Sequence, residues 1–423
     1  MDPTRQDSLS RVSPPGGDSR VLPASTRSVP WKRLRPLERV FAWTLRNLHG
    51  GNLQITFPSG VRAFVGDRSF PVLQLEIKKS RFFSKVLSGG SIGFGEAHVE
   101  GDWDTPDLSG LLLLLAKNQK DLGIIGRGFS ILAKQANRIY HKARRNTLER
   151  SKENIQAHYD LSNDFYQTFL DPSMTYSSAL FLSLEESLEQ AQLNKIDRML
   201  DLADVGEGDS ILEIGSGWGA LALRAAQRGY RVKTITLSEG QFAYAKDLFE
   251  HEGVSDRVEI VLEDYRMQTG QYDAVLSCEM IEAVGHEYLD SYFQIVSQLL
   301  KPKARAVIQA ITIPDERYES YCRSCDWIQK HIFPGGHLPS RSAICEHLAS
   351  AGEAAIIKME AFGHDYAETL RRWSASFNAA KSTVDALGFD EAFRRKWNYY
   401  LSYCEAGFDA DLIDVQHVVI EKN

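Results

Sequence analysis

Between residues 210 and 311 the sequence alternates between short apolar runs and amphipathic segments, and this alternation restricts the fold more than any other feature of the chain. Strands that are joined by helices pair in parallel, with helices covering both faces of the sheet. The pattern therefore predicts an α/β fold built on a parallel, doubly wound sheet. The expected strands are 210–214, 232–236, 257–262, 273–278 and 305–311, and the expected helices are 220–228 and 241–252.

The chain has 423 residues, enough for about two domains, and its composition changes before the alternating region begins. It is expected to divide into a disordered Pro-, Ser- and Arg-rich tail at 1–35, a small α+β module at 36–118, a basic helical connector at 119–152 and the larger α/β domain at 153–423. The small module is expected to have its own core and to contain strands at 52–57 and 72–77 and a helix at 107–117.

The connector region is strongly basic, because ten lysines and arginines between residues 117 and 152 are opposed only by Asp121 and Glu149. One interpretation is a solvated linker helix. The other is a patch that binds an anionic membrane surface, since Leu, Ile and Phe interleave with the charges. The sequence leaves both open. Nucleic acid is not expected as a partner, because the net charge is −7 and no recognition motif accompanies the basic residues.

The five cysteines, Cys278, Cys322, Cys325, Cys345 and Cys404, are too few and too scattered for a disulfide framework. Cys322 and Cys325 form a C-x-x-C motif, but no second pair completes a zinc site, so no metal is predicted. The sequence has no apolar run of about 18 residues and no signal-peptide pattern. The chain is therefore expected in the cytoplasm, with peripheral association at the inner face of the membrane.

The segment EIGSGWG, from Glu213 to Gly219, closes the first expected strand of the α/β domain and opens a helix. Glycines allow a tight turn and let a ligand approach exposed N–H groups of the helix. The spacing also fits a dinucleotide loop. Two details favour S-adenosylmethionine. Glu213 can stabilise the cationic end of that cofactor, and Asp264 and Tyr265 follow the third strand, where the adenine amino group can bind.

Seven further features of the sequence are the segments HYDLSNDFYQTFLDPSMTYSSALF from His158, ILEIGSGWGALALRAA from Ile211, TLSEGQ from Thr236, EMIEAVG from Glu279, HIFPGGHLPS from His331, GHDYAETLRRW from Gly363 and YYLSYCEAGF from Tyr399. With them the chain resembles the cyclopropane-fatty-acyl-phospholipid synthase family, which includes the mycolic acid cyclopropane synthases. The resemblance is strong over about residues 150–423 and looser before them. It implies a Rossmann-like class I methyltransferase domain, unsaturated phospholipid acyl chains as substrates, and a homodimer.

The loop motif and the resemblance together assign twelve cofactor-binding residues. They are Tyr176 and Ser177, which would close over the cofactor, Glu213, Gly215, Gly217 and Gly219 in the loop, Thr236, Leu237, Ser238 and Gln241 beside the ribose and adenine, and Asp264 and Tyr265 at the adenine edge. Ser238 is also a good helix N-cap, and the two roles are compatible.

The family reaction transfers a methyl group to a double bond in a lipid acyl chain and leaves a carbocation. A base then removes a proton. Loss from the new methyl group closes a cyclopropane, whereas loss from a chain carbon leaves a methyl-branched alkene. In the family this base is assigned to a bound bicarbonate, held by a Cys, a Glu, a His, a backbone amide and a Tyr. By the resemblance Glu282 matches the Glu, Tyr366 the Tyr and Ile311 the residue that offers its amide.

Two positions depart from the family pattern, since Ser178 replaces the Cys and Gln309 the His. Both can still donate hydrogen bonds to an oxyanion. Glu282 is expected to orient the proton acceptor, with Tyr366, Ser178 and Gln309 as its hydrogen-bond partners. The expected base is Glu282 itself, a bound bicarbonate, or Tyr366 with an unusual pKa. By the resemblance, Cys404 aligns with a cysteine that is assigned a catalytic role in some relatives. We favour the interpretation that Cys404 is a small buried residue that packs a helix.

The sequence thus predicts a cyclopropane synthase acting on phospholipid. Two alternatives are a related enzyme that makes a methyl-branched acyl chain and a lipid-binding protein that has lost catalysis. The intact cofactor loop argues against the last. Five histidines are interpreted as structural: His158, His286, His331, His337 and His364.

Overall fold

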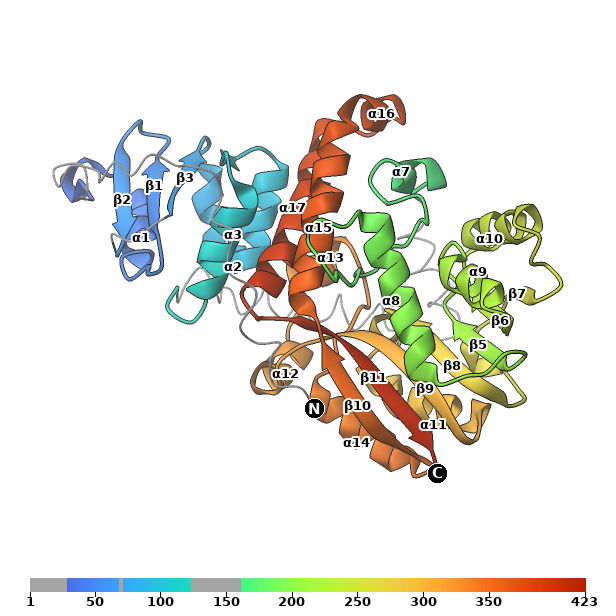
Figure 1. Cartoon of the computed structure of the whole chain (residues 1–423). Coiled ribbons are helices and arrows are strands. Elements are labelled where there is room, and N and C mark those ends of the chain that lie inside the picture. Colours follow the sequence, from blue (N-terminus) through green and yellow to red (C-terminus); the bar gives the residue numbers. More distant parts are fainter. Residues whose placement is uncertain (1–28, 68–70, 123–160) are drawn as a thin grey trace.

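The computed structural model describes residues 29–67, 71–122 and 161–423. In chain order the elements are η3 (Trp31–Arg33), α1 (Pro36–Thr44), β1 (Asn52–Thr56), β2 (Arg62–Gly66), β3 (Val72–Ile77), α2 (Arg81–Val99), β4 (Trp103–Asp104), α3 (Leu108–Lys117), α7 (Asn163–Gln167), α8 (Leu188–Ala203), β5 (Ser210–Ile214), α9 (Ala220–Gln227), β6 (Arg231–Thr236), α10 (Glu239–His251), β7 (Val258–Leu262), η4 (Tyr265–Met267), β8 (Tyr272–Cys278), η5 (Ile281–Ala283), η6 (His286–Tyr288), α11 (Leu289–Leu299), β9 (Leu300–Thr312), α12 (Asp315–Cys322), α13 (Trp327–His331), α14 (Arg341–Ala351), β10 (Ala354–Ala361), α15 (Gly363–Ala379), α16 (Lys381–Ala386), α17 (Glu391–Asp409) and β11 (Asp414–Lys422). In Figure 1 the elements up to α3 lie at one end, the large sheet lies at the other, and α15 and α17 stand between them.

The large sheet has the strand order β10-β11-β9-β8-β5-β6-β7. Its five strands from β9 to β7 are parallel, as the alternation predicted. The sheet is nevertheless mixed, because β11 runs antiparallel to both β9 and β10. The prediction of a parallel sheet is therefore confirmed for the five strands it named and does not hold for β10 and β11. It rested on strands up to residue 311, and the two strands that change the sheet come later in the chain.

Helices cover both faces of this sheet. On one face α8 and α9 bury Met199, Leu200 and Leu221. On the other, α11 and α14 bury Phe293 and Leu348. The Rossmann-like α/β fold is confirmed, and both faces are closed by apolar side chains at helical spacing.

The small module contains a four-stranded sheet of order β2-β1-β3-β4, in which β1 pairs antiparallel with β2 and parallel with β3. The predicted strands and helix correspond to β1, β3 and α3. The helix begins after Asp107, whose carboxylate accepts a hydrogen bond from the Gly110 amide at 2.8 Å.

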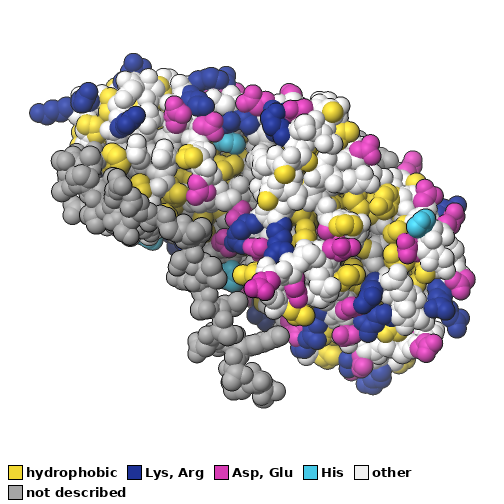
Figure 2. Space-filling model, turned by 45° about the horizontal axis from the view of Figure 1, so that its top comes forward, with side chains coloured by type: hydrophobic (Ala, Val, Ile, Leu, Met, Phe, Trp, Pro, Cys, Tyr) yellow, Lys and Arg dark blue, Asp and Glu magenta, His cyan; other side chains and the backbone are white. Residues whose placement is uncertain are grey.

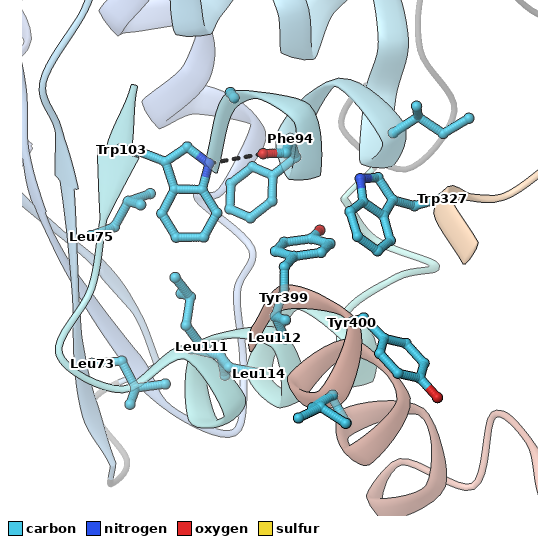
Figure 3. Packing of buried hydrophobic residues seen from close by; sticks show 14 of the residues in the cluster. Leu73, Leu75, Phe94, Trp103, Leu111, Leu112, Leu114, Trp327, Tyr399 and Tyr400 are labelled. Carbon is cyan, nitrogen blue, oxygen red and sulfur yellow. Dashed lines mark hydrogen bonds between the residues drawn. The ribbon is translucent and has the colours of Figure 1, made fainter. Parts of the chain in front are cut away.

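The small module has no core of its own, contrary to the prediction. Its buried side chains join one continuous cluster with those of α13, α15 and α17. Figure 3 shows Tyr399 of α17 beside Phe94 and Trp103 of the module, with Trp327 of α13 on its other side. The rings of Trp327 and Tyr399 have centroids 4.6 Å apart. The aromatic face of α17 thus needs the module to cover it.

Helix α2 contains the glycine-rich stretch 89–95, for which the sequence suggested no element. It is kinked at Gly90, where φ is 58°. A Cβ at Gly95 would lie 2.5 Å from Nε1 of Trp327 and 2.7 Å from the Tyr399 ring. These glycines therefore allow α13 and α17 to approach α2 closely.

Residues 1–28 and 123–152 lie outside the described residues, so most of the predicted tail and connector remain predictions. The end of the predicted tail has a defined structure, because Trp31–Arg33 form η3 and Leu34 is buried. Among the described helices, none is long and apolar enough to cross a membrane.

Candidate functional site

A cleft opens at the carboxyl ends of β5 and β8. Strand β5 pairs with β6 on one side and with β8 on the other, so the strand order reverses here. Doubly wound sheets bind ligands at such a switch point. Ten of the twelve residues predicted to bind the cofactor line the cleft: Tyr176, Ser177, Glu213, Gly215, Gly217, Thr236, Leu237, Gln241, Asp264 and Tyr265.

Gly217 lines the cleft where the loop leaves the most room. Its φ is 49°, a left-handed conformation that favours glycine. A Cβ placed there would meet no atom within 4 Å, so the backbone borders open space. A ligand can therefore approach the main chain at this point.

Gly219 and Ser238 do not line the cleft, and each has a structural role. A Cβ at Gly219 would lie 3.0 Å from Ala245 and Phe249, so this glycine allows α9 and α10 to pack. The hydroxyl of Ser238 accepts a hydrogen bond from the Gln241 amide at 3.3 Å and caps α10.

Glu213 is a buried carboxyl group in the cleft wall, with 2% of its surface exposed. It accepts a hydrogen bond from the Thr234 hydroxyl at 2.5 Å. Burial raises the pKa of Glu213 to about 8, against the opposing effects of Thr234 and the charge of Lys195. A carboxylate desolvated in this way is stabilised by a cation placed beside it. The residue fits the sulfonium of the expected cofactor.

Lys195 was missed by the sequence analysis although it also lines the cleft. It is 1% exposed, and its Nζ donates hydrogen bonds to Ser177 Oγ at 2.8 Å and Cys278 Sγ at 3.4 Å. It thereby holds the predicted cofactor-covering segment against β8. The available signal was its spacing of four residues from both Ala191 and Met199, which places a charge on the buried stripe of α8.

Arg266 is a second cleft residue that the sequence analysis missed. Its Nε and Nη2 donate to the two carboxylate oxygens of Asp264 at 2.8 and 2.6 Å. The predicted adenine-side carboxylate is therefore already in a bidentate ion pair. The neighbouring Tyr265 ring packs edge-on against Tyr292, with centroids 5.5 Å apart.

The carboxylate at the centre of the predicted base site belongs to Glu279, not to Glu282. Glu279 Oε1 accepts hydrogen bonds from the Ser178 amide and from Gln309 Nε2, both at 2.8 Å. Glu279 Oε2 accepts one from the Tyr366 hydroxyl at 2.7 Å. The expectation that these three residues bind Glu282 is wrong, because β8 delivers Glu279 to them with a strained φ of 50°.

Glu282 lies beside this group and is satisfied on one side only. Its Oε1 accepts a hydrogen bond from the Ile311 amide at 2.5 Å, while its buried Oε2 has no partner among the described residues. Burial, and then the charge of Glu279, raise the pKa of Glu282 to about 8. Burial also raises the pKa of Glu279, but its three donors oppose this. Of the two, Glu279 therefore carries the charge and Glu282 the proton.

Tyr366 and Cys404 do not have the properties of bases. Burial raises the pKa of Tyr366 well above its ordinary value, and its hydroxyl donates to Glu279. Tyr366 is thus excluded as a base near neutral pH. Burial raises the pKa of Cys404 as well, so it remains a thiol. Neither residue lines the cleft.

An aromatic wall stands beside Tyr176 on the cleft. The ring centroid of Tyr176 lies 5.2 Å from that of Tyr166 and 5.3 Å from that of Trp373. Its hydroxyl is 2.8 Å from that of Tyr400. Aromatic faces of this kind stabilise a neighbouring cation and exclude water.

The family model for mycolic acid cyclopropane synthetase matches residues 146–418, well over half of the chain. The chain belongs to this family. It is 39% identical to tuberculostearic acid methyltransferase UfaA1 of Mycobacterium tuberculosis over 370 residues, which cover 86% of both chains. It is 33% identical to cyclopropane-fatty-acyl-phospholipid synthase of Escherichia coli, over 82% of this chain and 87% of the relative.

Solved structures of the family agree with the fold. The cyclopropane synthase CmaA1 in complex with SAH and CTAB is 32% identical, with a TM-score of 0.60 over 64% of this chain and 98% of that one. The present chain is, as a member of the family, an S-adenosyl-L-methionine-dependent methyltransferase. Its open backbone at Gly217 and its buried Glu213 fit that cofactor. The contacts of individual residues with the cofactor remain predictions.

Proposed function

We propose that this methyltransferase adds a methyl group to the double bond of an unsaturated fatty acyl chain in a phospholipid and leaves a methyl-branched chain. The observation that carries the proposal is the position of Glu279. Its carboxylate accepts hydrogen bonds from Gln309 Nε2, the Tyr366 hydroxyl and the Ser178 backbone amide. The first two of these groups were expected to hold a bicarbonate, whereas the Ser178 hydroxyl, also expected there, donates to the Ala179 carbonyl. Another expected group, the Ile311 amide, donates to Glu282.

The proton acceptor is then a side chain of the protein and not a bound ion. When bound, S-adenosyl-L-methionine supplies a sulfonium methyl group that an alkene carbon attacks, and a carbocation forms on the neighbouring carbon. Tyr176 and its aromatic neighbours shield this cation from water. Glu279 lines the cleft and takes one proton from the cation, becoming a carboxylic acid. We assign this proton to a carbon of the acyl chain next to the cation, so the C–H electrons re-form a double bond and the product is a methyl-branched alkene.

Two relatives support different outcomes of this step. The 39% identical relative is named as a methyltransferase, whereas the 33% identical relative is named as a cyclopropane synthase. Cyclopropane formation is therefore the competing function. It requires the proton to leave from the new methyl group.

The test is the product. The chain is expressed in cells with unsaturated phospholipids and methyl-labelled methionine, and the acyl chains are analysed by mass spectrometry with fragmentation. We expect a labelled methyl branch in the cells, and with the purified enzyme on unsaturated phospholipid vesicles the same rate of its formation in buffer with and without carbonate. A cyclopropane as the main product would overturn the proposal, and so would a requirement for bicarbonate.

A variant tests the role of the tethered carboxylate directly. Glu279→Ala removes the base and leaves the donors of Ser178, Gln309 and Tyr366 facing a small space. We expect its turnover to be very low and to rise again when bicarbonate is added. Glu282→Ala is the matched control, because it removes a carboxyl group that those donors do not contact.

We further propose that the chain meets phospholipid through its N-terminal helix. Leu37, Val40 and Trp43 project from α1 at a spacing of three residues and are 40–51% exposed, and Trp31 lies just before the helix. Arg46 lies 3.7 Å over the Trp43 ring. At the left end of Figure 2 basic and hydrophobic side chains lie next to one another. Aromatic and basic residues together favour an anionic membrane interface.

Sedimentation with anionic vesicles tests this surface. Trp43→Ser together with Arg46→Glu is expected to weaken vesicle binding, whereas Ile357→Ser, an exposed apolar residue of β10, leaves it unchanged. Equal binding by both variants would assign membrane contact to another surface.

A further inference from the structure

Three potential metal ligands from separate segments meet outside the cofactor cleft. They are His286 at the start of η6, Cys322 at the end of α12, and His337 in the loop before α14. One ligand atom from each lies within 4.8 Å of the other two. The two histidines belong to those that the sequence analysis interpreted as structural.

The two imidazoles point at a common position. The hydroxyl of Tyr318 lies 2.8 Å from His286 Nδ1 and 3.0 Å from His337 Nε2. Tyr318 also stands one turn before Cys322 on α12, so its oxygen is on the same side of that helix as the thiol. The Tyr318 oxygen is thus within hydrogen-bonding distance of both ring nitrogens, and the Cys322 thiol lies beside them.

We propose that His286, Cys322 and His337 bind a zinc ion, with the Tyr318 oxygen or a water in the fourth position. A site with two imidazole nitrogens and a thiolate binds zinc in preference to calcium or magnesium. Tetrahedral bonds of about 2.0–2.3 Å put ligand atoms roughly 3.3–3.8 Å apart, so the ligand atoms must approach one another by at most about 1.5 Å. His286 and Cys322 are exposed and His337 is buried, so we assign this shift to the two exposed side chains.

The C-x-x-C motif does not form this site. Cys325 is turned away, and its Sγ lies 3.5 Å from the Asp326 carbonyl oxygen. The second half of the site comes from histidines that are distant in sequence. A search for a second cysteine pair therefore could not find it.

The zinc would hold the loop that carries Glu282. The His337 amide donates to the Glu282 carbonyl at 2.8 Å, and His286 follows Glu282 by four residues. None of the three ligands lines the cofactor cleft. The site is therefore a positioning clamp on the η5–η6 loop, and its existence does not depend on which lipid product the enzyme makes.

The test uses the full chain without a histidine tag. The protein is stripped with a chelator, titrated with zinc and assayed for bound metal, and a parallel sample is loaded with cobalt(II). We expect about one zinc per chain, a thiolate-to-cobalt charge-transfer absorption band, and a higher unfolding temperature with zinc. No band and no stoichiometric zinc in the unmodified chain would overturn the proposal.

Variants locate the site. Cys322→Ser is expected to abolish the charge-transfer band and to weaken zinc binding by tenfold or more, and His286→Ala to weaken it similarly. Cys325→Ser is the matched control and should keep both. Because Cys322 is exposed, Cys322→Ser without metal should unfold at the same temperature as the metal-free original. If Cys322→Ser and Cys325→Ser bind zinc equally, the assignment is wrong.

Discussion

The predicted cofactor loop and the proposed proton acceptor, Glu279, line the same cleft, but they are assembled differently. The loop is one continuous segment after β5, and its glycines act through their own backbone. Glu279 itself directly follows β8, and its hydrogen-bond donors come from three other segments: Gln309 from β9, Tyr366 from α15 and the Ser178 amide from the segment before α8.

This difference explains why the cofactor loop keeps the family motif while the predicted base site departs from it. A loop whose geometry is local keeps its function as long as its own residues are kept. A group assembled from four distant segments can be altered at any one of them, because the residues on the other segments stay in place. The departures at Ser178 and Gln309 are therefore confined to the predicted base site.

Glu279→Gln should produce the largest loss of turnover. If turnover stayed normal, Glu279 would not be the proton acceptor and its contrast with the cofactor loop would fail. The amide keeps the size of the side chain but cannot take up the proton, so turnover should fall by about a hundredfold or more. Affinity for S-adenosylmethionine, measured by calorimetry, should be unchanged. Glu282→Gln is the control. It should have a clearly smaller effect, because glutamine resembles the protonated acid that Glu282 is at neutral pH.

Gly217→Val should abolish cofactor binding, whereas the substitution at Glu279 should leave it unchanged. The valine side chain would enter the open space beside the loop, so binding of S-adenosylmethionine should fall below detection in calorimetry. Gly208→Val is a matched control, because Gly208 has a φ of 83° and open space around its Cβ but does not line the cleft. Both variants carry similar backbone strain. Normal affinity in Gly217→Val would remove the loop from the cofactor site.

The pH dependence of stability tests the protonation of Glu282. Its pKa is raised from 4.5 to about 8 in the folded state, which therefore binds this proton more tightly than the unfolded chain. Its contribution to the free energy of unfolding is complete below pH 4.5 and is lost as the pH rises to 8, by at most about 1.4 kcal/mol per pH unit. Glu282→Gln should show a shallower decline in denaturant unfolding between pH 5 and 8. Parallel curves would mean that Glu282 is ionised throughout.

Cys404→Ala should have the smallest effect. The thiol does not line the cleft and stays protonated, so turnover should remain close to normal and the free energy of unfolding should fall by about 1 kcal/mol. A large loss of turnover without loss of stability would place a reactive group outside the site described above.

Much of the fold could be predicted from the sequence because its signals are local. The strands β5 to β9 contain short apolar runs, and α3 begins after a capping aspartate. Lys195 could have been found too, as a charge on an apolar helical stripe. The shared core could not, because the aromatic face of α17 contains no indication of which surface covers it.

The sequence by itself determined the α/β domain, the cofactor loop and the family, since each depends on residues close together in the chain. Only the tertiary structure decided that Ser178, Gln309 and Tyr366 donate to Glu279 while Glu282 keeps its proton. It also decided that Cys322 meets two histidines instead of a second cysteine pair. A hydrogen bond or a metal ligand set depends on distances of a few ångströms between segments far apart in sequence, and those distances are fixed only when the chain packs.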